Sequence, residues 1–142
     1  MGNLYTYFAA TDDAAAATAI DGESFPDTEL VLDASVDPIV ELGTLESILS
    51  GRPYEEVADD PRSGHLLADG GECWVVTVTE GAATALAGAQ APRHAEAAVA
   101  WSHTDELEGS DPADLAEVIG GLSGLATHAA ARGWKLYCWM SL

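Results

Sequence analysis

Apolar residues recur at three- and four-residue steps between Asp111 and Gly133, which is the spacing of one face of an α-helix. The residues of this face are Leu115, Val118, Ile119, Leu122, Leu125, Ala126 and Ala129. Asp111 can cap the first turn, Pro112 suits the first helical position, and Gly133 can take the left-handed conformation that ends a helix. The pattern predicts a helix that leads directly into an aromatic strand, WKLYCWMSL, which begins at Trp134.

Other segments have the β-branched and aromatic content of strands. LYTYFA covers residues 4–9, and ECWVVTVT, over residues 72–79, has the strongest strand pattern of the interior and predicts a central strand. A short strand is expected over residues 29–33. Residues 59–71 combine proline, serine, glycines and aspartates, which predicts an exposed, mobile loop. The predicted helices cover residues 11–20, 39–51, 80–89, 92–98, 102–109 and 111–133, with one further turn over 53–58.

This order of elements predicts an α+β fold, with a single domain over residues 1–142 and helices packed on a small sheet of three or more strands. Two of the strands carry the same dipeptide, Cys73-Trp74 and Cys138-Trp139. We expect these strands to be neighbours. We also expect the dipeptides to pair, which would place both thiols on one face of the sheet and both indoles on the other.

The charge of the chain is its most unusual property. Its 142 residues include 24 carboxylates against five lysines and arginines, which gives a formal net charge of −19. Such a charge repels phosphates, so binding to nucleic acids or anionic membranes is not expected, whereas a basic protein would be attracted. Three interpretations remain open: a solvated surface of a salt-adapted proteome, docking to a basic protein, and mimicry of nucleic acid. The even spread of carboxylates along the chain favours the first.

The N-terminus lacks the basic and apolar regions of a signal peptide, and no apolar run approaches the length of a membrane span. A cytoplasmic protein is therefore expected. Cys73 and Cys138 both lie in apolar strand patterns, which predicts buried thiols rather than a disulfide.

Candidate catalytic chemistry is sparse. The four histidines form no metal-binding spacing and no cofactor motif is present, so neither a metal nor a cofactor is expected. The best acid–base group is His103 with Asp105 and Glu106, since adjacent carboxylates stabilise an imidazolium. The alternative is that Ser102 and Asp105 form a capping box and the other side chains are solvated.

Aromatic side chains offer a second candidate site. If the first and last strands are near each other, a cleft or binding surface would be lined by Tyr5, Tyr7, Tyr137 and Trp139, with Trp101 as a wall. The opposite face of the last strand, with Trp134, Leu136, Cys138 and Met140, is expected to be buried. The alternative is that all of these aromatic residues belong to the core.

Three segments carry a resemblance: DPIVELGTLESILSGRPYEEV, WSHTDEL and ARGWKLYCWMSL. In this order they resemble a family of uncharacterised actinobacterial proteins, and the layout of the chain is similar to the YfbM-like domain of unknown function. The resemblance implies a bacterial α+β domain. It implies no activity and no catalytic residue.

The leading hypothesis is a non-enzymatic interaction protein that docks to a basic partner, as immunity or regulator proteins do. The alternative is a small-molecule binder or an enzyme that uses the aromatic cleft together with His103 and a carboxylate. The oligomeric state is left open by the sequence.

Overall fold

A single antiparallel sheet in the order β2-β1-β5-β4-β3 lies at the centre of the computed structural model, which describes residues 4–142. The strands are β1 (Leu4–Ala10), β2 (Val31–Asp33), β3 (Leu66–Asp69), β4 (Cys73–Thr77) and β5 (Lys135–Ser141). The predicted α+β fold is confirmed. The segment predicted to be a central strand forms β4, which is an interior strand between β5 and β3, and β5 lies at the middle of the sheet.

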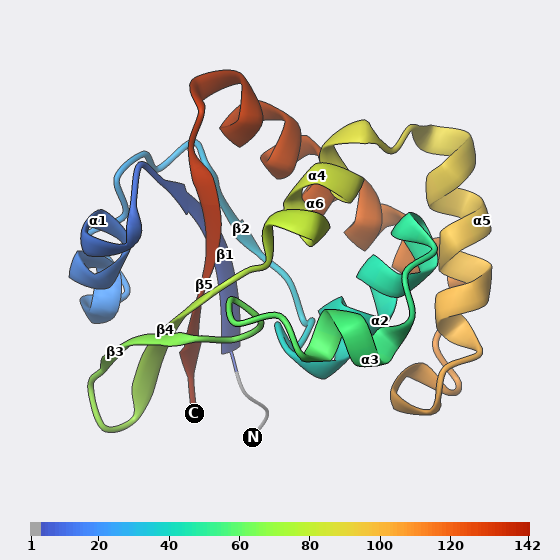
Figure 1. Cartoon of the computed structure of the whole chain (residues 1–142), viewed down its shortest axis with the longest axis horizontal. Coiled ribbons are helices and arrows are strands. Elements are labelled where there is room, and N and C mark those ends of the chain that lie inside the picture. The colour runs from blue at the N-terminus through green and yellow to red at the C-terminus, as the bar shows by residue number, and fades with distance from the viewer. Residues whose placement is uncertain (1–3) are drawn as a thin grey trace.

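Helices cover both faces of this sheet unequally (Figure 1). Of the helices in residues 4–142, α1 (Asp13–Ala17) and the 3₁₀ turn η1 (Thr18–Asp21) lie on one face. The opposite face carries α2 (Val40–Ser50), α3 (Tyr54–Ala58), α4 (Glu80–Gly88), α5 (Ala91–Ser102) and α6 (Pro112–Arg132), with the 3₁₀ turn η2 (Asp105–Leu107) after α5. The sheet therefore separates a large core from a small one.

The α6–β5 unit has the predicted form. The Asp111 carboxylate accepts a hydrogen bond from the backbone N–H of Ala113 at 2.9 Å, and Gly133 ends the helix with φ +70°. The chain then enters β5, which pairs with β1 on one side and β4 on the other.

Both faces of β5 are buried at its middle, since Leu136, Tyr137 and Cys138 are all inaccessible to solvent. The expectation that one face of this strand would be free for ligand was wrong, because α1 and η1 cover it. At the two ends of the expected buried face, Trp134 and Met140 remain partly exposed.

The predicted adjacency of the two Cys-Trp strands is correct, but the predicted register is wrong. Val76 pairs with Cys138, and Val75 pairs with Trp139. Residues that are directly opposite each other share a face, so Cys73 and Cys138 point to opposite faces of the sheet. Both cysteines are free thiols, Cys138 buried and Cys73 partly exposed.

Two local predictions were also wrong. The segment expected to be a loop contains β3, which pairs with β4 across a turn closed by a hydrogen bond of 2.8 Å from the Gly70 N–H to the Cys73 carbonyl. The capping box at Ser102 is absent from the described residues, because α5 continues to Ser102 and His103 is its C-terminal cap. Thr104 precedes η2 without a side-chain capping bond.

Candidate functional site

The largest cavity described lies between α4 and the C-terminal half of α6, above the adjoining ends of β4 and β5. We call it the α4–α6 groove, and its volume is about 420 Å³. Its lining consists mainly of small apolar side chains, and the complete set is Val78, Thr79, Glu80, Ala83, Thr84, Ala87, Ala126, Ala129, Ala130, Gly133, Trp134, Lys135 and Leu136.

The groove follows from the topology. Strands β4 and β5 are hydrogen-bonded neighbours, and the ladder continues at 3.3 Å from the Val78 N–H to the Leu136 carbonyl. Strands in a sheet lie about 4.8 Å apart, whereas packed helices need about 8–10 Å between their axes. Helix α4, which leaves β4, and helix α6, which enters β5, therefore separate where they meet the sheet.

Polar contacts define both ends of the groove. At one end the Ser123 hydroxyl donates to the Leu86 carbonyl at 2.7 Å, which holds α4 and α6 together. The Thr127 hydroxyl donates to the Ser123 carbonyl at 2.8 Å and also lies 3.4 Å from the Ala87 carbonyl. At the other end the Lys135 ammonium lies 3.5 Å from the Glu80 carboxylate. The groove is therefore a short trough with a closed end and an ion-paired end.

Trp134 forms the aromatic part of the lining. The Arg132 guanidinium lies 5.1 Å from the centre of its indole ring and is also paired with the carboxylate of Asp27. A cation at this distance is attracted by the ring and favours one orientation of the indole. The contact with Arg132 therefore helps to hold the Trp134 ring in place as one wall of the groove.

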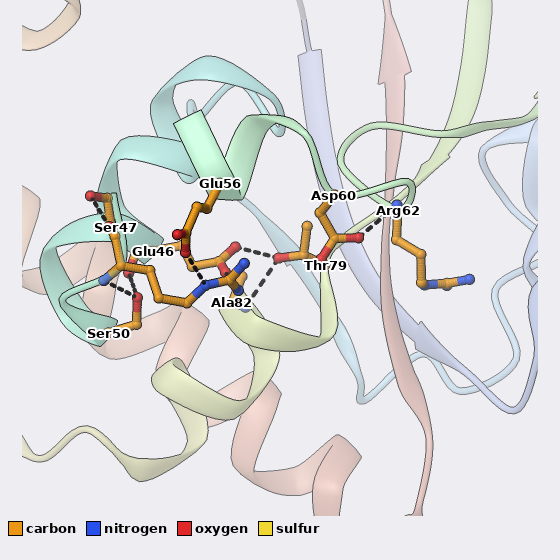
Figure 2. Close-up of polar contacts among 9 residues, drawn as sticks. Glu46, Ser47, Ser50, Glu56, Asp60, Arg62, Thr79 and Ala82 are labelled. Atoms are coloured by element: carbon orange, nitrogen blue, oxygen red, sulfur yellow. Dashed lines mark hydrogen bonds and ion pairs between the residues drawn. The ribbon is translucent and has the colours of Figure 1, made fainter. Parts of the chain in front are cut away.

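A buried carboxylate lies behind the groove. Glu46, on α2, is 2% exposed; its Oε1 accepts a hydrogen bond from the Thr79 hydroxyl, and its Oε2 lies 3.3 Å from Nη1 of Arg52. The Thr79 oxygen in turn accepts the N–H of Ala82 at 3.1 Å, which caps α4 (Figure 2). Because Thr79 also lines the groove, this network fixes the position of the start of α4.

Gly81 makes this arrangement possible. A Cβ atom at position 81 would lie 2.3 Å from Glu46 Oε2 and 3.1 Å from Nη1 of Arg52. A larger residue would therefore displace the Glu46 carboxylate from its ion pair with Arg52.

A second, acidic depression lies between β2 and the start of α6. We call it the β2–α6 depression; its volume is about 340 Å³, and its lining is Leu32, Asp33, Ala34, Asp114, Glu117, Val118 and Gly121. A Cβ atom at Gly121 would lie 3.3 Å from Leu32, so the glycine permits α6 to approach β2 closely. The depression combines apolar side chains with three carboxylates.

All five lysine and arginine side chains are already paired with carboxylates. The pairs are Arg52 with Glu46 and Glu56, Arg62 with Asp13, Arg93 with Glu96, Arg132 with Asp27, and Lys135 with Glu80. Six of the 24 carboxylates take part, which leaves 18 that have no lysine or arginine partner within residues 4–142. The surface charge is therefore almost entirely negative.

The predicted aromatic cleft is not formed. Tyr7 pairs with Cys138 and Phe8 with Tyr137, so Tyr5 and Tyr7 face the large core, whereas Tyr137 and Trp139 face the small one. The Tyr7 hydroxyl donates to the Val36 carbonyl at 2.6 Å. The prediction failed because β1 and β5 pair with an offset that places the two aromatic sets on opposite faces.

Trp101 and Trp139 have structural contacts of their own. Trp101 is fully buried, and its indole N–H donates to the Glu41 carbonyl at 3.1 Å. The Trp139 indole N–H donates to the Ile20 carbonyl at 3.0 Å. A Cβ atom at Gly22 would lie 2.7 Å from the Trp139 ring, so η1 packs directly on it.

The predicted acid–base group is on the surface. His103, Asp105 and Glu106 are exposed at the end of α5 and in η2, and none of them lines a cavity described here. Nothing in their arrangement excludes water or positions a substrate. Elsewhere, burial raises the pKa of the Cys138 thiol well above its usual value, so this cysteine stays protonated and is a poor nucleophile.

Tyr137 belongs to a polar cluster with Asp13 and Arg62. The Arg62 guanidinium binds the Asp13 carboxylate through two hydrogen bonds of 3.0 and 3.1 Å, and the Tyr137 hydroxyl donates to it at 2.7 Å. The bonds from Arg62 and then from Tyr137 lower the pKa of Asp13 from 3.8 to about 2. The cluster holds α1 against β5 and the segment before β3.

This cluster predicts a specific acid dependence of stability. Because the folded-state pKa of Asp13 is depressed, its contribution is fully present above pH about 4 and is lost as the pH falls toward 2. Urea unfolding from pH 2 to 7 should show the wild type and Asp13→Asn converging over that range. Arg62→Met should reduce the size of this acid-dependent loss, because without its largest cause the folded-state pKa of Asp13 rises toward the unfolded value. Parallel curves for the wild type and Asp13→Asn would contradict the assignment.

Within residues 4–142, no group of three or more histidine, cysteine, aspartate or glutamate side chains is placed to hold a metal ion. In the same part of the chain no helix combines the length and the apolar character needed to cross a bilayer.

Comparison with protein-family models, with curated proteins and with solved structures gave no match to this chain. The resemblances inferred from sequence segments therefore stay predictions. The groove, the buried Glu46 and the β2–α6 depression were all missed by sequence reasoning.

Proposed function

We propose that this chain is a non-enzymatic interaction protein that binds a basic partner protein in the cytoplasm, in the manner of an immunity or regulator protein. The observation that carries the proposal is the pairing of all five lysines and arginines, which leaves 18 carboxylates without such a partner in the described residues. A partner with a basic surface would be attracted by most of this molecule, whereas a partner with a phosphate-rich surface would be repelled.

The β2–α6 depression is the best candidate contact within this surface. A lysine or arginine side chain has an apolar stem and a charged head. Leu32, Ala34 and Val118 can contact the stem, while Asp33, Asp114 and Glu117 provide oxygens for the head. One clustered contact would supply the specificity that dispersed charge lacks.

The test is capture of basic proteins from lysate on the immobilised chain, with a resin that carries polyglutamate as the reference. We expect proteins that this reference does not retain to bind at about 0.05 M salt and to elute near 0.5 M, because the screening length falls from above 10 Å to a few ångströms. An identical set of proteins on both resins, or no retention at low salt, would contradict the proposal.

A matched pair of variants locates the contact. The first changes Asp33→Asn, Asp114→Asn and Glu117→Gln, and the second changes Glu72→Gln, Glu106→Gln and Glu108→Gln. Both remove three charges from the surface, so their effect on the general field is the same. Selective loss of binding in the first variant would place the partner at the β2–α6 depression.

A further inference from the structure

We propose that the α4–α6 groove is a binding site for a neutral, largely apolar small molecule. This inference goes beyond protein interaction and uses a different part of the surface. Its volume of about 420 Å³ falls within the range of about 300–1,000 Å³ that is typical of small-molecule pockets.

The shape of the groove favours a compact ligand over a partner helix. Its α4 wall is nine residues long, so it extends about 13 Å at 1.5 Å per residue. The hydrogen bonds from Ser123 and Thr127 close one end, and the ion pair between Glu80 and Lys135 spans the other. A helix much longer than about 13 Å would extend past the groove and over one of these contacts.

The electrostatic surroundings define the charge of the ligand. Residues 81–95 and 118–142, which supply most of the lining, contain neither aspartate nor glutamate, although the chain as a whole carries −19. The one carboxylate in the lining, Glu80, is paired with Lys135. An anion would be repelled by the net charge and would find no unpaired lysine or arginine, while a cation would find no unpaired carboxylate in this lining.

The groove also offers an aromatic surface and a few polar groups. Trp134 can stack on a flat apolar ligand. The Thr79 hydroxyl is occupied, since it donates to Glu46 and accepts from Ala82. The exposed Thr84 hydroxyl and the Lys135 ammonium remain as the groups that can bind one carbonyl or hydroxyl of the ligand.

Two fluorescent probes test the ligand class. N-phenyl-1-naphthylamine is neutral, and 8-anilino-1-naphthalenesulfonate has the same ring skeleton with an added sulfonate. We expect the neutral probe to bind at least about tenfold more tightly, because the net charge opposes the sulfonate. Binding of the anionic probe with equal or higher affinity would overturn the inference, as would the absence of binding by the neutral probe.

Adjacent alanines on α6 provide a matched pair of variants. Both are exposed, but Ala130 lines the groove and Ala131 does not. Ala130→Phe should fill the groove and lower the affinity of the neutral probe by about tenfold or more. Ala131→Phe should leave that affinity unchanged. Equal affinities in the two variants, with circular dichroism confirming that both are folded, would overturn the inference.

Trp134 gives an independent readout of position. Trp134 is the one tryptophan of the four that lines the groove, so Trp134→Ala should weaken binding of the neutral probe by about tenfold, because it removes the aromatic wall. An affinity equal to that of the wild type would place the probe elsewhere and overturn the inference. The affinity of the neutral probe should also be insensitive to salt. Binding of a basic partner protein should depend on salt, so the two proposals can be tested independently.

Discussion

Replacing Trp101 with alanine is expected to lower the free energy of unfolding by about 3–5 kcal/mol, the usual cost of removing a large aromatic side chain from a core. Trp101 is completely inaccessible and belongs to the large core between α2, α5 and α6. Its indole N–H also donates to the Glu41 carbonyl at 3.1 Å and contacts the Thr44 hydroxyl oxygen at 3.3 Å. The substitution removes both the packing and the link from α5 to α2.

Trp101→Phe separates these two contributions. The phenyl ring retains much of the apolar volume and loses the indole N–H, so we expect a smaller loss, of about 1–2 kcal/mol. Equilibrium urea unfolding followed by circular dichroism measures both variants. A loss below about 1 kcal/mol for Trp101→Ala would contradict the assignment of this residue to the core.

Replacing Arg52 is expected to destabilise the fold more than replacing its partner, Glu46. The Glu46 side chain is 1% exposed, whereas that of Arg52 is 41% exposed. Arg52→Met leaves a buried carboxylate with only the Thr79 hydroxyl, which should cost about 2–4 kcal/mol after allowance for the exposure of the arginine. Glu46→Gln should cost about 1–2 kcal/mol, since an amide oxygen can still accept from Thr79 and the free guanidinium is solvated.

The double variant Arg52→Met with Glu46→Gln is the control for this asymmetry. It leaves no buried charge, so it should be more stable than Arg52→Met alone, as a double-mutant cycle in urea would measure. The interpretation fails if Glu46→Gln is the more damaging single change. It also fails if the two single effects add.

Local sequence features predicted the elements that depend on neighbouring residues. The periodicity, N-cap and C-terminal glycine of α6 are contained in residues 111–133, and the structure has this helix at the predicted place. The capping box at Ser102 was overridden because Ala97, Ala98 and Trp101 are buried and continue α5 to that point. In this case tertiary packing determined where the helix ends.

The burial of both faces of β5 could not be predicted, because the alternation of side chains along a strand does not indicate which elements cover each face. The layer of α1 and η1 buries Tyr137 and contacts Trp139, and this layer lies more than 100 residues earlier in the chain. The strand register is likewise set by long-range pairing. Both failures concern relations between distant segments, which a local pattern does not contain.

Signals for the missed features were nevertheless present. Glu46 occupies the third position of a series Leu42, Leu45, Glu46 and Leu49, so it lies on an apolar helix face, where a glutamate needs a partner. The absence of carboxylates from residues 81–95 and 118–142 also stands out in so acidic a chain. The groove itself was hidden because alanines predict close packing.

The position of β5 has a consequence for folding during synthesis. It is the last of the five strands to be translated, and it alone connects the β1–β2 pair to the β3–β4 pair. Until β5 has left the ribosome, the two pairs share no strand, and each exposes an edge that can hydrogen-bond to another chain. The sheet therefore forms after translation of residue 141, by contacts between distant segments, which favours slow folding and a need for chaperones.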